Sequence, residues 1–134
     1  MTITLTRNFQ RSEFACECGC GFDTADFLLV QTLQDERDYF ESIYGRVRLV
    51  ITGRNRCKAH NAATPGAAPN STHTEGKAAD HHIDRWLGGK WVRIDPQEQY
   101  DYLDSSFPDS CGIGLYSNRV HFDTRAAKAR WDKT

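Results

Sequence analysis

Residues 71–80 read STHTEGKAAD, a polar turn that runs into a strand of small residues. His73 precedes Gly76, which permits a tight turn, and Asp80 lies on the strand that leaves that turn. Alternate residues of a strand share one face, so Ala78 is expected beside Asp80 on the same face. The stretch therefore predicts that His73 and Asp80 converge on one point, with room there for a metal ion and a small molecule.

Residues 120–123 read VHFD and offer a third ligand. This short apolar segment is typical of a strand, on which His121 and Asp123 would share a face. Two histidines and one carboxylate form a ligand set of hydrolytic zinc sites, which keep a fourth position for water. Two interpretations stay open on spacing alone. One is a zinc site of His73, Asp80 and His121, and the other is a set of His–Asp pairs with a surface or structural role.

The segments around these residues mix helical and strand patterns. Apolar residues at helical spacing predict a helix over 23–44. A short helix is predicted over 56–62 and another over 95–103, with Asp95 as its N-cap and Pro96 at its first position. Asp23 or Thr24 is the expected N-cap of the first helix, and Gly45 is expected to end it. Strands are predicted over 46–52, 77–83, 111–116 and 119–124, with a turn at 88–89 and a helical turn over 126–131. The predicted class is α+β, with a small antiparallel sheet flanked by helices.

Composition limits the remaining possibilities. The chain has 134 residues, and we expect residues 1–134 to form a single domain. A net charge of −1 argues against a nucleic-acid partner, which needs a basic surface. No stretch approaches the roughly 20 apolar residues of a membrane span. Residues 1–10 lack the apolar core of a signal peptide, so we expect synthesis in the cytoplasm.

Four ordered blocks carry a resemblance to a known family. Residues 71–80 fit the pattern Ser-x-His-x-x-Gly-x-Ala-x-Asp and are followed by a His-x-Asp strand, which resembles the zinc D-Ala-D-Ala peptidases. That group also contains lysostaphin-like peptidases and the hedgehog signalling domain. Residues 9–21 (FQRSEFACECGCG) resemble the start of small phage and prophage members. Residues 51–61 (ITGRNRCKAHN) and 111–131 resemble two further blocks of the family.

The resemblance implies a hedgehog-like peptidase fold and one Zn²⁺ ion held by His73, Asp80 and His121. It implies hydrolysis of peptide stems or cross-links of bacterial peptidoglycan, with D-Ala-containing bonds as the target. The protein would be a phage or prophage lysin, expected as a monomer, that reaches the cell wall after release or as part of a phage particle.

Three residues are expected to contact the substrate. Arg56 matches a family Arg beside the substrate, where its planar fork suits a carboxylate or a polarised carbonyl oxygen. Ser71 belongs to the same motif as the first ligand. His82 is predicted on the strand face of Asp80, where it would line the pocket or compete as a ligand.

The positions at which the family carries its general base hold other residues in this chain. Relatives carry Asp or Glu three residues before the last zinc histidine, or His two residues before it, and here these positions are Asn118 and Arg119. Asp123 is the first candidate for the base, and Glu75 is a weaker one. Alternatively, Asp123 orients a ligand histidine or pairs with Arg125. Loss of the base would leave a zinc-binding recognition or structural module instead of an enzyme.

The five cysteines allow three interpretations. The thiols are free and buried, or an N-terminal cysteine bridges to Cys57, or N-terminal cysteines join Cys57 or His60 in a second metal site. No Cys-x-x-Cys pair is present, which excludes a zinc ribbon. The first interpretation is preferred, because spacing alone does not define the geometry of a bridge or a metal site. The cysteines are Cys16, Cys18, Cys20, Cys57 and Cys111.

Overall fold

The structure is a computed structural model that describes residues 3–56, 58–65, 67 and 71–134, without the side chains of residues 58 and 60. The predicted roles of Cys57 and His60 therefore lie outside what is described. The elements follow one another as β1 (Thr4–Thr6), β2 (Phe9–Gln10), η1 (Arg11–Phe14), α1 (Phe27–Tyr44), β3 (Val47–Gly53), α2 (Lys58–Ala63), η2 (Thr72–Glu75), β4 (Ala78–Leu87), β5 (Lys90–Arg93), α3 (Pro96–Ser106), β6 (Gly112–Leu115), β7 (Val120–Asp123) and β8 (Ala129–Asp132).

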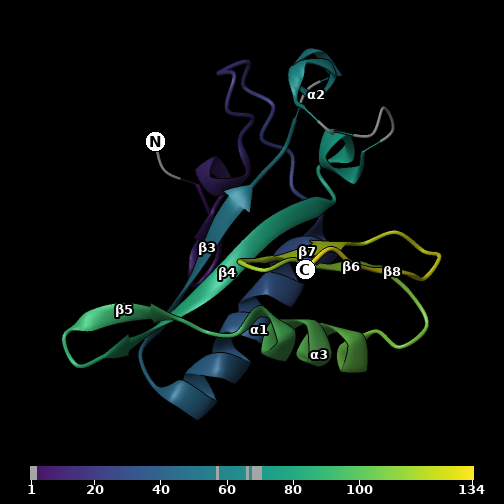
Figure 1. Cartoon of the computed structure of the whole chain (residues 1–134). Coiled ribbons are helices and arrows are strands. Elements are labelled where there is room, and N and C mark those ends of the chain that lie inside the picture. The colour runs from purple at the N-terminus through teal and green to yellow at the C-terminus, as the bar shows by residue number, and fades with distance from the viewer. Residues whose placement is uncertain (1–2, 57, 66, 68–70) are drawn as a thin grey trace.

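A six-stranded sheet forms the centre of the fold and confirms the predicted α+β class (Figure 1). Its main path has the order β3-β4-β7-β6-β8, and β5 pairs with β4. Every pairing is antiparallel except that of β8 with β6, which is parallel. Strands β1 and β2 form a separate two-stranded sheet. The long strand β4 contacts three partners and so connects most of the chain.

Helices α1 and α3 pack on one face of the sheet, and α2 lies beyond the end of β3 (Figure 1). Helix α1 begins after Asp26, whose side chain accepts a hydrogen bond from Leu29 N, and it ends at Gly45 with φ 79°. The predicted end at Gly45 is confirmed. The predicted N-cap, Asp23 or Thr24, was wrong, because Asp26 N is bonded to Gly76 O and the preceding residues are held as a loop.

The C-terminal segment corrects a second prediction. A helical turn was expected over 126–131, but residues 129–132 form strand β8. Ala129 N donates to Cys111 O, which starts the parallel pairing with β6. Gly114 on β6 has no side chain, and the indole of Trp131 occupies the space where a Cβ would lie. The hydrophobic pattern of so short a segment does not indicate that it pairs with β6.

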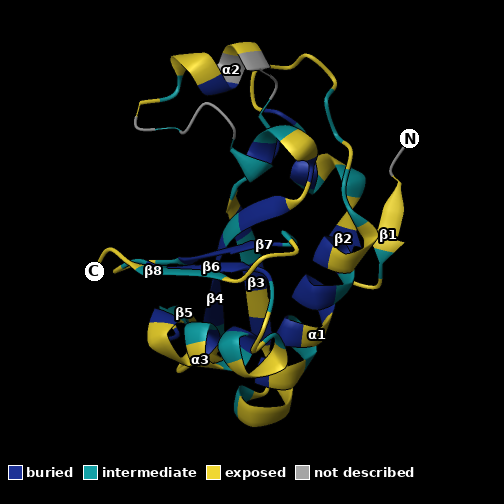
Figure 2. Ribbon diagram, turned by 90° about the vertical axis from the view of Figure 1, so that its right-hand side faces the viewer, coloured by how far each residue is buried: buried dark blue, intermediate teal, exposed yellow. Residues whose placement is uncertain are grey.

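A polar network lies inside the core, where α1, β4 and α3 meet. Buried residues concentrate on the inner sides of these elements (Figure 2). Glu36 of α1 is fully buried and its two oxygens bond His81 Nε2 and Gln99 Nε2, each at 2.8 Å. These bonds tie both helices to the central strand. His81 lies on the strand face opposite Asp80, as the alternation predicts.

Replacing Glu36 with Ala should lower the free energy of unfolding by about 3 kcal/mol or more, because His81 and Gln99 lose a buried partner. Urea denaturation measures this loss. The matched control is Glu41→Ala on the same helix, which removes the pair of an exposed carboxylate with Arg37 and should cost about 0.5 kcal/mol or less. Equal losses for the two variants would contradict a structural role of the network.

Candidate metal centre

Three predicted ligands, from three different elements, come together at one end of the sheet. His73 lies on η2, Asp80 on β4 and His121 on β7. Asp80 and His121 are register partners on neighbouring antiparallel strands. The Asp80 oxygens lie 2.8 Å from His121 Nδ1 and 3.5 Å from His73 Nε2. One ligand atom from each residue lies within 4.8 Å of the others, so the three side chains form a compact group of donors.

Hydrogen bonds at the short helix η2 fix the position of His73. The Ser71 side chain caps this helix and accepts a bond from His73 N at 3.2 Å. Gly76 ends the helix with φ 70°, a conformation that glycine adopts without strain. His73 Nδ1 lies 3.0 Å from Arg54 O, a carbonyl that can only accept. Nδ1 therefore carries the hydrogen, and the lone pair of Nε2 points toward Asp80.

His121 is oriented in the same manner by Asp123. Its Nε2 lies 2.7 Å from Asp123 Oδ2, so Nε2–H donates and Nδ1 faces Asp80. Burial by itself lowers the pKa of His121, but the protonated ring can donate to both Asp123 and Asp80, and these hydrogen bonds outweigh burial and raise the pKa. Burial likewise acts to raise the pKa of Asp80, whereas His121 and His73 hold it far below its ordinary value. The centre thus favours positive charge between these groups.

The donor set fits a zinc ion. Each histidine has its outer nitrogen bonded to an oxygen of the protein, the arrangement that orients a metal-binding imidazole and fixes its tautomer. The two inner nitrogens and the Asp80 carboxylate converge, and such electron pairs repel one another unless a cation or a proton lies between them. Two histidines and one carboxylate leave the fourth tetrahedral position open. The side chains of His73 and His121 are nearly buried, and that of Asp80 is 22% exposed.

Asp123 lies behind His121 and does not line the pocket. It is fully buried, and its oxygens accept from His121 Nε2, Gly112 N, Thr72 Oγ1 and the Arg125 backbone and guanidinium. Burial acts to raise its pKa, but the bonds from His121 and Arg125 hold it well below the ordinary value. A Cβ on Gly112 would collide with this carboxylate, so glycine is required there.

A pocket of about 470 Å³ opens over the three candidate ligands. Arg56 and Ser71, two of the predicted substrate contacts, lie in its wall, and Arg56 Nη2 donates to Ser71 Oγ at 3.0 Å. Asp80 is the one carboxylate among the described residues of the wall. Further wall residues are Tyr116, Arg119, Arg125, Trp131 and Lys133.

A family model described as Peptidase M15 matches residues 7–123, which include all three candidate ligands and Asp123. The chain belongs to the peptidase M15 family. This membership makes the protein a metallopeptidase and confirms the resemblance to the zinc D-Ala-D-Ala peptidases. No curated protein and no solved structure matches the chain.

The third predicted substrate contact, His82, lies at the edge of the M15 peptidase centre. It shares a neighbouring pocket with Asp80 and Asn118. Its Nε2 lies 3.4 Å from Asp84 Oδ2, so this ring is oriented by Asp84. Burial lowers the pKa of His82 and outweighs the opposing effect of Asp84. The structure does not bring Glu75 to the main pocket, because this side chain is exposed on η2.

Sequence reasoning gave no pocket role to Tyr116, Arg119 or Trp131 of this peptidase. The Trp131 ring centroid lies 5.1 Å from that of His121, and Trp131 Nε1 donates to the Tyr116 hydroxyl at 3.1 Å. The Arg119 guanidinium lies 4.0 Å from the Tyr116 ring centroid. Trp131 reaches the pocket only because β8 returns to the sheet. The sole sequence signal was an isolated Trp after the His-x-Asp strand.

Asp84 generates a pH-dependent prediction. Burial acts to raise its pKa, but bonds from Arg48 and Arg93 outweigh burial and lower it. A lowered pKa stabilises the fold above the ordinary carboxyl pKa, and this stability is lost as the pH falls through the lower value. Asp84→Asn should therefore cost about 1 kcal/mol at pH 7, and the difference from wild type should shrink below about pH 4.

Urea denaturation across this pH range measures the effect. The control is Asp104→Asn, which replaces the more exposed side chain of Asp104 in its pair with Arg130 and should change stability by less than about 0.5 kcal/mol. A cost of Asp84→Asn that grows as the pH falls would contradict the assigned ion pairs.

Proposed function

We propose that this M15 peptidase is a zinc-dependent peptidase that hydrolyses the peptide stems or cross-links of bacterial peptidoglycan, with D-Ala-containing bonds as its target. The observation that carries the proposal is the convergence of His73 Nε2, His121 Nδ1 and the Asp80 carboxylate beneath an open pocket. Both outer imidazole nitrogens are already bonded, so the inner nitrogens remain available for the metal.

The pocket wall supports an acidic peptide as the substrate. Four cationic side chains stand in the described part of the wall, which holds one carboxylate, and that carboxylate is a candidate ligand. The cations are those of Arg56, Arg119, Arg125 and Lys133. Peptidoglycan stems carry free carboxylates, which arginine binds in a bidentate geometry. Arg56, fixed by Ser71, would hold a substrate carboxylate or the carbonyl oxygen that gains charge.

Zinc, when bound, would lower the pKa of water and polarise the scissile carbonyl. The protein's own residues have separate tasks in this proposal. His73, Asp80 and His121 hold the ion, and Asp123 holds the imidazole of His121 in the required tautomer. We assign Asp123 this positioning role because its oxygens are buried and already engaged. A general base must instead reach the reacting water directly or through one water.

The proposal extends to the form in which the protein acts and to its partner. Residues 1–134 would act as a single peptidase domain and as a monomer, in a phage or prophage lysin. Within the described residues, no helix combines the length and apolar character needed to cross a bilayer. The partner would be the peptidoglycan peptide.

Digestion of purified peptidoglycan sacculi tests the activity. The wild-type protein should release peptides whose new ends, identified by mass spectrometry, define the cleaved bond. His73→Ala should release none, because a catalytic zinc site does not function with two protein ligands. Ser12→Ala, on η1 and away from the pocket, should match wild type. New ends released equally by the His73→Ala protein would contradict a metal-dependent reaction.

A recognition module on the same scaffold is the second candidate function. Asp80 is the one carboxylate in the described pocket wall, and Asn118 stands where relatives carry a base. A protein that binds zinc and sediments with sacculi, but releases no peptides, would favour this module.

Asp123→Asn tests the positioning role directly. Both carboxylate oxygens accept hydrogen bonds, so the NH2 group of an amide would face either His121 Nε2 or the donors Gly112 N and Arg125 Nε. In either case the group that orients His121 is disturbed. Zinc affinity should fall about 10- to 100-fold, as measured by competition with a chelator. Asp84→Asn is the control and should retain wild-type affinity. If Asp123→Asn instead keeps full zinc affinity and only the turnover rate falls, Asp123 acts as the base and not through His121.

A further inference from the structure

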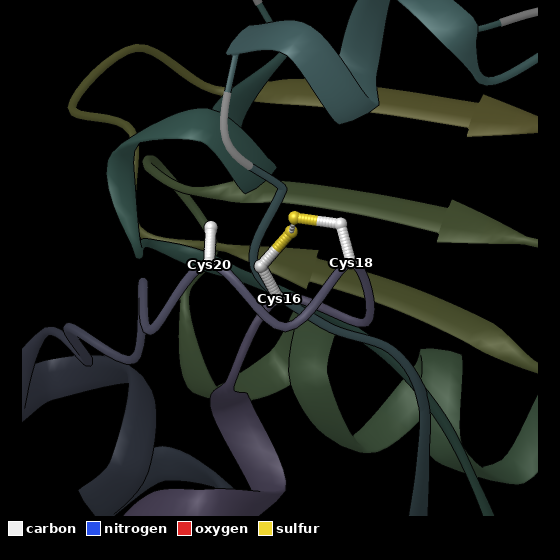
Figure 3. Close-up of side chains that lie close together, drawn as sticks. All are labelled: Cys16, Cys18 and Cys20. Atoms are coloured by element: carbon white, nitrogen blue, oxygen red, sulfur yellow. Dashed lines mark hydrogen bonds between the residues drawn. The ribbon is translucent and has the colours of Figure 1, made fainter.

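A second group of soft metal ligands lies outside the candidate centre, in the loop between η1 and α1. The thiols of Cys16, Cys18 and Cys20 lie within 4.8 Å of one another. Figure 3 shows the three side chains on one loop, with the sulfurs of Cys16 and Cys18 facing each other. Sγ of Cys16 is 3.3 Å from Sγ of Cys18. This distance exceeds the roughly 2.05 Å of a disulfide and approaches the ~3.8 Å between two sulfurs on a tetrahedral zinc ion with Zn–S bonds of about 2.3 Å.

The backbone of this loop turns the alternating cysteines toward one another. Gly19 and Gly21 adopt φ 80° and φ 89°, values that favour glycine. Gly19 N donates to Cys16 O at 3.2 Å, and Cys16 N donates to Phe22 O at 2.8 Å. The chain therefore folds back on itself at the two ends of the cluster. In an extended strand, by contrast, cysteines two residues apart would be roughly 7 Å apart.

The three cysteines differ in their exposure to solvent, and this difference would allow a metal ion to enter the cluster. Cys16 is buried, whereas Cys18 and Cys20 are exposed, so an ion can enter from solvent and reach an anchored ligand. This placement differs from the sequence expectation of buried thiols, which holds for Cys16 and Cys111. Thiolates are soft ligands, which select zinc over the hard cations magnesium and calcium.

The loop also touches the segment that holds His73. Arg54 Nε pairs with Glu17 of the loop at 3.6 Å, and Asn55 N donates at 3.2 Å to the carbonyl oxygen of Phe14, the last residue of η1. Asp26 N donates to Gly76 O at 2.9 Å, at the end of η2. Arg54 in turn provides the carbonyl that accepts from His73. The loop has no helix or strand between η1 and α1, so these contacts and the cysteine cluster determine its shape.

We propose that Cys16, Cys18 and Cys20 bind a second zinc ion, with a structural role, that fastens residues 16–26 against the wall of the His73 site. The three thiolates supply three of the four positions of a tetrahedral ion. This ion is distinct from the one at His73, Asp80 and His121, and its binding does not depend on peptidase activity.

Metal analysis of the purified protein tests the proposal. Wild type, purified without added reductant, should hold about two zinc ions per chain after dialysis. Cys18→Ser/Cys20→Ser and His73→Ala/His121→Ala should each hold about one. The matched thiol control is Cys111→Ser, which lies outside the cluster and should keep about two. A wild-type content of one zinc, unchanged in Cys18→Ser/Cys20→Ser, would overturn the proposal, and so would a disulfide joining these thiols to one another or to Cys57.

X-ray absorption at the zinc edge keeps the test decisive even if a variant fails to fold. In His73→Ala/His121→Ala, the remaining zinc should show sulfur ligands at about 2.3 Å. Zinc added to the metal-free form of this variant should also slow amide exchange in residues 16–26. A shell of nitrogen and oxygen alone, or unchanged exchange, would exclude the cysteine site.

Discussion

The carboxylate of Asp80 between two imidazoles is the interaction on which the arrangement of the site depends. The pairing of β4 with β7 places Asp80 opposite His121, and the cap formed by Ser71 brings His73 from η2 to the same point. Gly53 on β3 leaves the space that the Asp80 side chain occupies. Two neighbouring elements, η2 and β4, thus meet the distant strand β7 at the Asp80 carboxylate. A divalent cation bound there would neutralise this carboxylate and accept the electron pairs of both imidazoles.

Strand β4 serves stability on one face and the metal centre on the other. Asp80 points to the pocket, whereas His81 points into the core and bonds Glu36, which also holds Gln99 of α3. Alternate side chains of a strand point in opposite directions. The strand that contacts the helical layer therefore also carries a candidate metal ligand. A shift of one residue in the register of β4 would bury Asp80 and expose His81, so the core network also fixes the register of the site.

The sequence was most informative where chemistry and spacing coincide. His73, Asp80 and His121 were predictable because a turn and two strands with alternating side chains leave few ways to place them. Asp123 was predictable as a partner of His121 or Arg125, but its enclosure by Gly112 was not, because that contact depends on the pairing of β6 with β7. The remaining errors, the cap at Asp26 and strand β8, arose where a backbone contact with a distant segment overrides local preference.

The central claim is that His73, Asp80 and His121 bind zinc through Nε2, a carboxylate oxygen and Nδ1. The most direct measurement is anomalous diffraction from crystals of the zinc-loaded protein, recorded on both sides of the zinc absorption edge. We expect an anomalous peak about 2.0–2.2 Å from each of these three atoms. A zinc-loaded crystal with no peak there, or with a peak held by Nε2 of His121 in place of Nδ1, would contradict it.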